Sequence, residues 1–379
     1  MRFMRNVKGK LLSRGYTTGA CAAAAAKAAA DMLLGGVPVG QVSIMMPQGT
    51  ALDLKVLDIE LGDDWSSCAV RKDAGDDPDV TGGILVYARV EKIWSGIDID
   101  GGQGVGRVTR PGLDQPPGAA AINSVPREMI KRELDEIAER YSYAGGFSVV
   151  ISIPGGLELA QRTFNPRLGI EGGLSVIGTT GIVEPMSNQA VTDTIRLELR
   201  QLKETGVRDV LFTPGKYGET FVRQSLGLSM DGHVTCSNFI GDAIDGAVEL
   251  GFTRILLVGH IGKLVKLGIG VTNTHSSFGD GRMETLLACA LEAGAELSLL
   301  KGIANSVTTD GALALLGEAG LLNETMDVLG RRIDMCLRKR VPEGVTIGFL
   351  CFSKADPIRG ILTQSADAER LLEIWRIKG

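Results

Sequence analysis

Three glycine-rich segments follow short apolar runs that are typical of buried strands. They are residues 178–185 (GTTGIVEP), 213–218 (TPGKYG) and 259–263 (GHIGK). In an open parallel sheet, ligands bind outside the carboxyl ends of the strands, where glycines let the backbone approach a cofactor. Backbone N–H groups at helix starts suit its anionic group, and Glu184 can accept from ribose hydroxyls. Ordinary strand-to-helix turns are the alternative interpretation. The predicted cofactor-binding residues are Gly178, Thr179, Thr180, Gly181, Glu184, Gly215, Gly259, His260 and Gly262.

The segment 273–284 (NTHSSFGDGRME) places a histidine among hydroxyl side chains and near a carboxylate. Such a histidine suits acid/base work or hydrogen bonding to a ligand. We therefore predict His275 and Asp280 as catalytic residues. The alternative is that Asp280 and Gly281 form a turn that merely starts a helix. The three histidines lack Cys or Glu at ligand spacing, which argues against a protein-bound metal.

Several cationic side chains accompany these segments. Arg107 and Arg110 lie in 101–112 (GGQGVGRVTRPG), where Pro111 and the β-branched residues predict a glycine-rich turn or hairpin and not a helix. Lys263 and Lys266 are three residues apart and can share one side of a helix. Solvated side chains are the alternative in each case. These four residues and Arg282 are predicted to hold substrate carboxylates.

An almost pure alanine helix is predicted within residues 14–30 (RGYTTGACAAAAAKAAA). Thr17 or Thr18 can cap its start, and Gly35-Gly36 ends it. Small side chains let another backbone or a flat ligand approach closely, so Tyr16, Thr17 and Thr18 are predicted substrate-binding residues. A capped, tightly packed core helix is the alternative.

The composition is that of an ordinary globular protein. The chain has 379 residues, 44% hydrophobic and 22% charged, with a net charge of −5. That charge argues against a nucleic-acid binder, and an anionic substrate would need a local basic patch. Lys27, Asp31 and the polar loop before the alanines argue against a signal peptide, and no apolar run is long enough to span a membrane. Six scattered cysteines fit a reducing cytosol, so we expect a cytoplasmic protein.

Two domains are predicted. Residues 1–145 mix one or two helices with strand-like runs, which indicates an α+β domain with a mixed sheet. After Gly145-Gly146, short continuous apolar strands alternate with helices, which predicts a Rossmann-like α/β domain with a parallel sheet over 146–379. Residues 340–379 are left free to return to the first domain. The expected parallel strands are within 147–154, 174–181, 208–215, 233–239 and 254–260.

The glycine-rich and alanine-rich segments resemble one known family. The opening segment is similar to the signature of the cobalt-precorrin-5B C(1)-methyltransferases, the CbiD family of anaerobic cobalamin biosynthesis. The likeness recurs, in the family's order, over roughly residues 13–285. The similar blocks are 100–113 (DGGQGVGRVTRPGL), 121–130 (AINSVPREMI), 164–187 (FNPRLGIEGGLSVIGTTGIVEPMS), 213–218 and 259–284.

The resemblance implies the reaction, which is transfer of the S-adenosylmethionine methyl group to ring carbon 1 of cobalt-precorrin-5B, giving cobalt-precorrin-6A. The methyl donor would then be the only cofactor, because the cobalt belongs to the tetrapyrrole substrate. The resemblance is also compatible with transient contacts with neighbouring pathway enzymes and with a homo-oligomer. The family-like blocks carry these candidate substrate clamps: Arg14, Arg107, Arg110, Arg127, Arg167 and Arg282.

Two other functions stay open from the residues. A small-molecule kinase would use a glycine-rich turn to hold phosphates, but no GxxxxGK[ST] loop is present. A corrinoid carrier without catalysis would use the alanine helix as a flat packing surface, and would leave the three glycine-rich strand ends unexplained.

Overall fold

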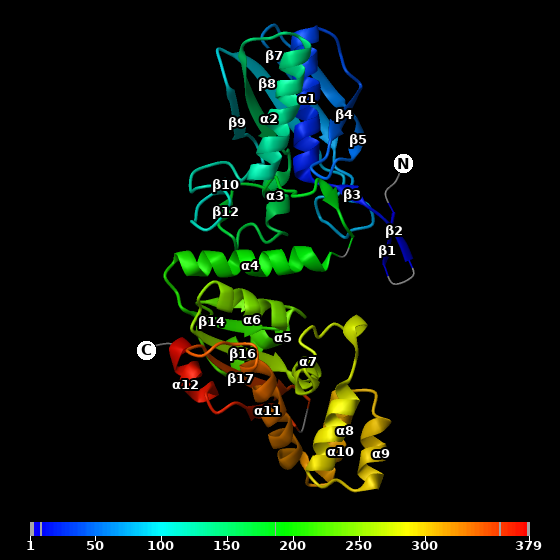
Figure 1. Cartoon of the computed structure of the whole chain (residues 1–379), viewed down its shortest axis with the longest axis vertical. Helices are drawn as coiled ribbons and strands as arrows, with labels where there is room; N and C mark the ends of the chain where they lie inside the picture. Colours follow the sequence, from blue (N-terminus) through cyan, green and yellow to red (C-terminus); the bar gives the residue numbers. More distant parts are fainter. Residues whose placement is uncertain (1–3, 8–9, 186, 356–357, 377–379) are drawn as a thin grey trace. The chain divides into compact units, whose positions relative to one another are not determined.

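The computed structural model describes residues 4–7, 10–185, 187–355 and 358–376. The chain forms two compact units, the first ending at Asn188 and the second beginning at Gln189 (Figure 1). This division comes later than the sequence indicates. The strand β11 (Gly146–Ser152), expected to open the second domain, pairs with β8 (Leu85–Ile93) and β9 (Ile97–Gly101) of the first unit.

A mixed sheet forms one layer of the first unit, as the sequence predicts. Its strand order is β6-β7-β8-β11-β9, with β6 at Leu57–Leu61 and β7 at Trp65–Arg71. All pairs are antiparallel except β11 with β9. Along β8, buried Val86, Ala88 and Val90 alternate with partly exposed residues. This period of two means that one face of the sheet is covered and the other meets solvent.

Helix α1 (Thr18–Gly35) begins and ends where the sequence predicts. The Thr17 side chain accepts a hydrogen bond from the backbone N–H of Ala20 at 3.2 Å. At the other end Gly36 adopts a left-handed conformation, with φ of 70°, and its N–H donates to the carbonyl of Met32 at 2.8 Å. Glycine is favoured there because it has no Cβ to clash in this conformation.

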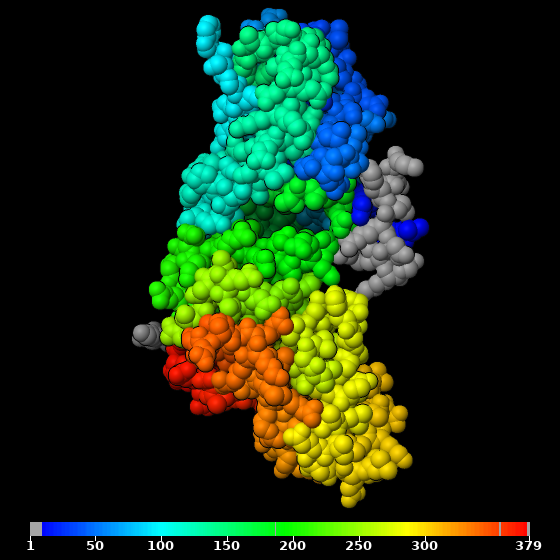
Figure 2. Space-filling view, in the orientation of Figure 1, coloured from blue at the N-terminus to red at the C-terminus, as the bar shows by residue number. Residues whose placement is uncertain are grey.

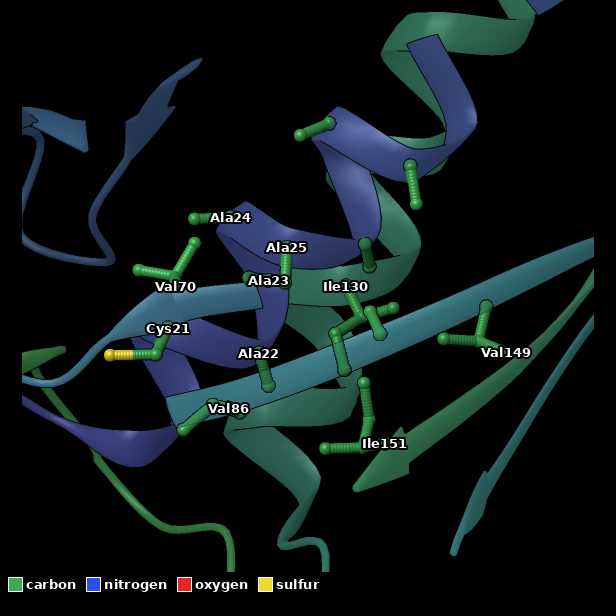
Figure 3. Close-up of a cluster of buried hydrophobic side chains, with 14 of the residues drawn as sticks. Cys21, Ala22, Ala23, Ala24, Ala25, Val70, Val86, Ile130, Val149 and Ile151 are labelled. Carbon is green, nitrogen blue, oxygen red and sulfur yellow. The ribbon is translucent and has the colours of Figure 1, made fainter. Parts of the chain in front are cut away.

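Alanines let α1 lie very close to its neighbours. The helix packs on β7 and β8 and against α2 (Ser124–Arg140). Every residue from Thr18 to Ala30 is buried, and Figure 3 shows Cys21 to Ala25 within this buried cluster. From β7, the Ser66 hydroxyl donates to the carbonyl of Ala29, and the Cys68 thiol donates to the carbonyl of Ala25 at 3.2 Å. Side chains of the sheet thus reach the helix backbone itself, which larger residues on α1 would prevent.

Lys27, the one charged residue in the alanine run, holds α1 to α2. Its ammonium group donates to Glu133 and Glu136, each at 2.7 Å, and both Lys27 and Glu133 are buried. Arg132 and the backbone N–H of Met45 also donate to Glu133. A buried charge is tolerated only when it is paired in this way.

The remaining parts of the first unit are small. The predicted strand at 174–181 is not part of a parallel sheet, because Leu174 and Val176 form only isolated bridges to Val105 and Ile122. The other elements are β1 (Met4–Val7), β2 (Lys10–Ser13), β3 (Gly15–Tyr16), β4 (Gln41–Met45), β5 (Ala51–Lys55), β10 (Arg107–Val108), α3 (Gly156–Ala160), β12 (Ile170–Glu171) and β13 (Ile182–Val183).

The second unit is built on the parallel sheet that the sequence predicts. Its order is β15-β14-β16-β17-β18, with the first four strands parallel and β18 antiparallel at the edge. Since β17 and β18 belong here, the C-terminal residues do not return to the first sheet. The bounds are β14 (Asp209–Thr213), β15 (His233–Thr235), β16 (Arg254–His260), β17 (Thr346–Ser353) and β18 (Gly360–Gln364).

Both faces of this sheet are buried, which explains its continuous apolar strands. Successive residues of β16 point to opposite faces, so Leu256 and Leu257 belong to two separate clusters of buried hydrophobic side chains. Figure 2 shows the yellow and orange atoms of α8–α10 as a lobe of this unit. The helices are α4 (Asn188–Glu204), α5 (Lys216–Thr220), α6 (Ile240–Glu249), α7 (Ile261–Leu264), α8 (Arg282–Glu292), α9 (Leu297–Ala304), α10 (Thr309–Glu318), α11 (Leu322–Arg338) and α12 (Ala368–Leu372), with short turns η1 (Phe221–Ser225), η2 (Val265–Ile269), η3 (Ser276–Phe278) and η4 (Glu373–Trp375).

The close packing of α1 makes a testable prediction about stability. Replacing Ala25 by Leu should lower the free energy of unfolding by about 1–3 kcal/mol, because the added carbons have no space beside Cys68. Ala304→Leu, at an exposed helix end, is the matched control and should change little. Urea unfolding followed by circular dichroism measures both, and equal stability of the two variants would contradict this account of the packing.

Candidate functional site

The predicted 178–184 loop lies in the first unit, beside the start of α1. The strand β13 pairs with β3, so Ile182 is opposite Tyr16 and Val183 is opposite Gly15. The backbone N–H of Thr17 donates to the carbonyl of Gly181 at 2.9 Å. The structure therefore brings the predicted Tyr16–Thr18 substrate residues together with a predicted cofactor loop. It also removes that loop from the strand ends of the parallel sheet, where the sequence had put it.

The polar groups of Tyr16–Thr18 already have protein partners. The Thr18 hydroxyl accepts from the N–H of Ile177 at 2.9 Å, and the Gly19 N–H donates to the Ile177 carbonyl at 3.0 Å. The Tyr16 hydroxyl donates to the carbonyl of Arg71 at 3.1 Å, and burial raises the pKa of Tyr16 to about 12. With Thr17 capping α1, these residues fix the loop and close the N-terminus of the helix.

The glycines of this loop serve contacts within the protein. A Cβ on Gly178 would lie 2.1 Å from the Thr17 hydroxyl oxygen, and one on Gly181 would lie 2.4 Å from Met46. Thr179 is exposed, and the Thr180 hydroxyl turns back to Ile182. Glu184 forms an ion pair with Arg14 at 3.0 Å. The glycines do mark positions that other groups approach closely, but those groups are side chains of the protein itself.

The predicted clamp arginines differ in how far they are engaged. Arg107 makes two hydrogen bonds to Asp100, at 2.6 and 2.8 Å, which hold the pKa of Asp100 below its usual range. Arg127 donates to the carbonyls of Ile122 and Ile99, each at 2.8 Å.

Arg110 is exposed and has no hydrogen bond or ion pair within the described part of the chain, and the same is true of Arg167. The segment of Arg110 is held in place, because the Thr109 N–H and hydroxyl donate to the carbonyl of Gly169, at 2.8 and 2.9 Å. The segment 101–112 forms a turn at Gln103–Gly104 and not a hairpin, because β10 (Arg107–Val108) pairs with the distant β12 (Ile170–Glu171).

In the second unit, the remaining predicted cofactor residues share one edge of the parallel sheet. Gly215 follows β14, while Gly259 and His260 end β16 and Gly262 lies in α7 directly after it. Gly215 has a φ of 115°, and a Cβ there would meet nothing within 4 Å, so its backbone is open. Gly259 is instead required by packing, since a Cβ on it would lie 2.9 Å from Leu264.

His260 has a defined tautomer when it is neutral. Its Nδ1 accepts from the backbone N–H of Gly262 at 3.1 Å and so caps α7. The ring proton must then be on Nε2, which makes that nitrogen a hydrogen-bond donor. Burial lowers the pKa of His260 below its ordinary value, although Asp310 offsets this in part. His260 is therefore neutral at physiological pH and suited to donate, not to act as a base.

The two predicted lysines are more buried than solvated side chains would be. The Lys263 ammonium donates to the carbonyls of Pro214 at 2.6 Å and Ser237 at 3.2 Å, and so joins the loops after β14 and β15. Burial lowers the pKa of Lys263. Lys266 is buried and donates to the carbonyls of Thr274 and Gly279, at 3.2 and 3.0 Å. It holds the 273–284 loop in place.

The predicted catalytic pair is not arranged as an acid and a base. The His275 Nδ1 accepts from the N–H of Ser277 at 3.1 Å and meets its hydroxyl at 2.7 Å. Asp280 is held by Arg282, with one oxygen 2.8 Å from Nη2, and this guanidinium lowers the pKa of Asp280. Asp280 therefore stays ionised, and Arg282 is paired with it and not free.

Sequence reasoning missed three side chains at this edge, namely Tyr217, Asp310 and Lys354. The centre of the Tyr217 ring is 6.0 Å from that of His260, and the Lys354 ammonium lies 4.2 Å above the Tyr217 ring. The exposed ring of Tyr217 lies in the TPGKYG segment, where the sequence predicted a cofactor-binding glycine, Gly215, but not the tyrosine. Nothing in the local sequence shows that Asp310, some 50 residues after His260, lies near it.

Two hollows lie away from the predicted residues. One of about 590 Å³ is at the amino end of β14, beside Asp209 and Trp375. The other, of about 370 Å³, is beside Lys27 and β4. Neither is lined by a predicted site residue. Within the described residues, no cluster of His, Cys, Asp and Glu could hold a metal ion. Nor is any helix there long and apolar enough to cross a bilayer.

Comparison with known proteins identifies the family. A family model described as CbiD matches residues 5–185, and one described as "CbiD, C-terminal domain" matches residues 273–363. A protein of Ruminiclostridium cellulolyticum is 50% identical over 313 residues, covering 83% of this chain and 82% of that relative. This chain belongs to the CbiD family.

Other CbiD relatives match nearly the whole chain. A protein of Alkaliphilus metalliredigens is 43% identical over 374 residues, covering 98% of this chain and 97% of its own length. One of Salmonella typhimurium is 44% identical over 360 residues, covering 95% and 92%. All three relatives are named cobalt-precorrin-5B C(1)-methyltransferase. The 1.9 Å crystal structure of CbiD from Archaeoglobus fulgidus is 27% identical, with a TM-score of 0.40, and covers 74% of this chain and 87% of that one.

The contact between Gly178 and Thr17 can be tested by substitution. Gly178→Ala should lower the free energy of unfolding by about 1 kcal/mol more than Gly206→Ala does, because it also displaces the Thr17 cap of α1. Gly206 is the matched control, since its φ of 81° is also positive but a Cβ there meets nothing within 4 Å. Urea unfolding compares the two, and an equal loss would show that Gly178 is needed only for its backbone conformation.

Proposed function

We propose that this chain is a methyltransferase that transfers the methyl group of S-adenosylmethionine to ring carbon 1 of cobalt-precorrin-5B in cobalamin biosynthesis. The products are cobalt-precorrin-6A and S-adenosylhomocysteine. The relatives' shared name supports the reaction and the tetrapyrrole substrate. Cobalt enters as part of that substrate. When bound, S-adenosylmethionine supplies an electrophilic methyl group on a sulfonium.

The donor site that we propose is the carboxyl edge of the parallel sheet in the second unit. The observation that best supports it is that Gly215, His260 and Gly262 meet at this edge, as ligand-binding groups do in open parallel sheets. The open backbone at Gly215 permits close approach, and the His260 Nε2–H offers a directed donor. Lys263 fixes the loops around them.

The chain's part in this reaction is chiefly to orient the reactants. Holding the methyl group in line with an electron-rich ring carbon can supply about 7–11 kcal/mol of barrier reduction. A strong base is not needed for that step, because the ring supplies the electron density. This fits the paired state of Asp280 and the capping role of His275. In this proposal His275 helps to orient a reactant by donating a hydrogen bond from its Nε2.

The substrate's acetate and propionate groups require cations that are not already neutralised. Arg110 and Arg167 meet this condition within the described chain, whereas Arg107, Arg14 and Arg282 are paired with carboxylates. An unpaired guanidinium can bind a carboxylate through two parallel hydrogen bonds. We therefore place substrate carboxylates at Arg110 and Arg167 in this proposal.

Calorimetric titration with S-adenosylhomocysteine tests the donor site. We expect saturable binding to the wild-type protein, and about tenfold weaker binding to His260→Asn, which keeps an acceptor to cap α7 but lacks the Nε2–H. Affinity should be level from about pH 8 down to about pH 6.5 and fall only below that. A protonated ring keeps its Nε2–H but loses the Nδ1 acceptor that caps α7, and burial disfavours that protonation.

Magnesium-ATP is the control ligand and should not bind. Binding of ATP in place of S-adenosylhomocysteine would replace the proposal by a kinase. If neither ligand binds, including after the tetrapyrrole has been added, the methyltransferase proposal fails.

Steady-state kinetics test the role of Arg110. Arg110→Ala should raise the KM for the tetrapyrrole about tenfold with little change in kcat, because a carboxylate contact is the same before and during methyl transfer. Arg208→Ala, an exposed arginine at the amino end of β14, is the control and should match wild type. An unchanged KM for Arg110→Ala would remove this residue from the substrate site.

A further inference from the structure

Tyr217 presents an aromatic ring to solvent at the carboxyl edge of the parallel sheet. It lies in α5, two residues after the open backbone of Gly215, and is 64% exposed. Within the described residues its hydroxyl makes no hydrogen bond. A single exposed apolar side chain is common on protein surfaces, so the surroundings of this ring decide what it can do.

A row of aromatic rings supports Tyr217 from the protein side. The centre of its ring lies 6.0 Å from that of His260, which meets the buried Phe352 edge-on at 5.6 Å. Phe352 in turn stacks on Phe221, with ring centres 3.9 Å apart. The His260 ring is also fixed through its Nδ1, which accepts from the Gly262 N–H. Tyr217 therefore lies at the exposed end of a packed row of rings, and most of its own surface stays accessible.

Lys354 adds an unpaired cation beside the same ring. Its ammonium lies 4.2 Å from the centre of the Tyr217 ring, and it makes no hydrogen bond or ion pair with any other residue that the structure describes. A cation–π contact at an exposed site is weak. A flat ligand can therefore take the place of the ammonium on the ring and keep it as a hydrogen-bond donor at the ligand's own edge.

We propose that Tyr217 binds the methyl donor by stacking on its adenine ring. This inference rests on the proposed donor site and extends it to a residue outside the predicted cofactor set. Adenine is the flat aromatic part of S-adenosylmethionine, whereas the amino-acid part is aliphatic and charged and cannot stack. The ring nitrogens of adenine accept hydrogen bonds, and the Lys354 ammonium and the Nε2–H of His260 are donors beside the Tyr217 ring.

Calorimetric titration with S-adenosylhomocysteine tests the stacking contact. Tyr217→Ala should weaken binding about tenfold or more, because the stacking of a base on an aromatic side chain is lost. Tyr217→Phe keeps the ring and should bind nearly as wild type does, since the hydroxyl has no partner among the described residues. Trp94→Ala, which removes an exposed ring of the first unit, is the control and should match wild type. Equal affinity of Tyr217→Ala and wild type would overturn the inference.

Nuclear magnetic resonance tests which part of the ligand Tyr217 contacts. In protein with isotope-labelled tyrosine rings, the signal of Tyr217 is identified by its absence in Tyr217→Phe. When S-adenosylhomocysteine is bound, nuclear Overhauser effects should connect the ring protons of Tyr217 with the protons of the adenine base. Effects that reach only the sugar or the amino-acid part, or no effects at all, would overturn the inference.

Thermal unfolding separates recognition from a structural role. Free Tyr217→Ala should unfold close to the wild-type temperature, because the ring is mostly exposed, yet gain less stability from S-adenosylhomocysteine. If the free variant is strongly destabilised instead, the magnetic resonance contact in the wild-type protein decides.

Failure of this inference can be told apart from failure of the proposed function. If Tyr217 proves irrelevant while wild type still binds S-adenosylhomocysteine, only the adenine contact is lost and the proposed function stands. Failure of wild type to bind, with the tetrapyrrole present, removes the donor site together with this inference.

Discussion

The close approach of α1 to its neighbours is the constraint on which the first unit depends. A helix backbone can accept hydrogen bonds from side chains of a sheet only if its own side chains are small, and the alanines meet this condition. Lys27 adds a buried ion pair that joins α1 to α2. Breaking a buried pair costs more than the pair contributes, so the position of α1 is strongly specified. The loop at its start is fixed in consequence.

In the second unit, the positions of the predicted site residues depend on the parallel direction of the strands. It brings the ends of β14, β15 and β16 to one edge, although the residues are far apart in sequence. Lys263 then ties two of the loops together through backbone carbonyls. Burial keeps His260 neutral. Because its Nδ1 accepts a hydrogen bond from the Gly262 N–H, the ring nitrogen that can donate is Nε2. The result is a group of polar atoms with defined roles.

Much of this could be predicted from local patterns. Capping of α1 by Thr17, its end at Gly36 and the parallel sheet all follow from residue types and periodicity. The domain boundary could not be predicted in this way, because a buried strand such as β11 has the same pattern of apolar residues in a mixed sheet as in a parallel one. The 178–184 glycines were recognised as a site of close approach, but sequence cannot show whether a ligand or Thr17 is approached. Asp310 was missed because its proximity to His260 is purely tertiary.

The central claim is that this chain catalyses methyl transfer to the tetrapyrrole. The most direct test incubates the purified protein with cobalt-precorrin-5B and S-adenosylmethionine that carries an isotopic label in its methyl group, and locates the label by nuclear magnetic resonance. The account predicts one labelled methyl group on ring carbon 1 and an equal amount of S-adenosylhomocysteine. Binding of the tetrapyrrole with no transfer of label, or transfer to another ring position, would contradict it.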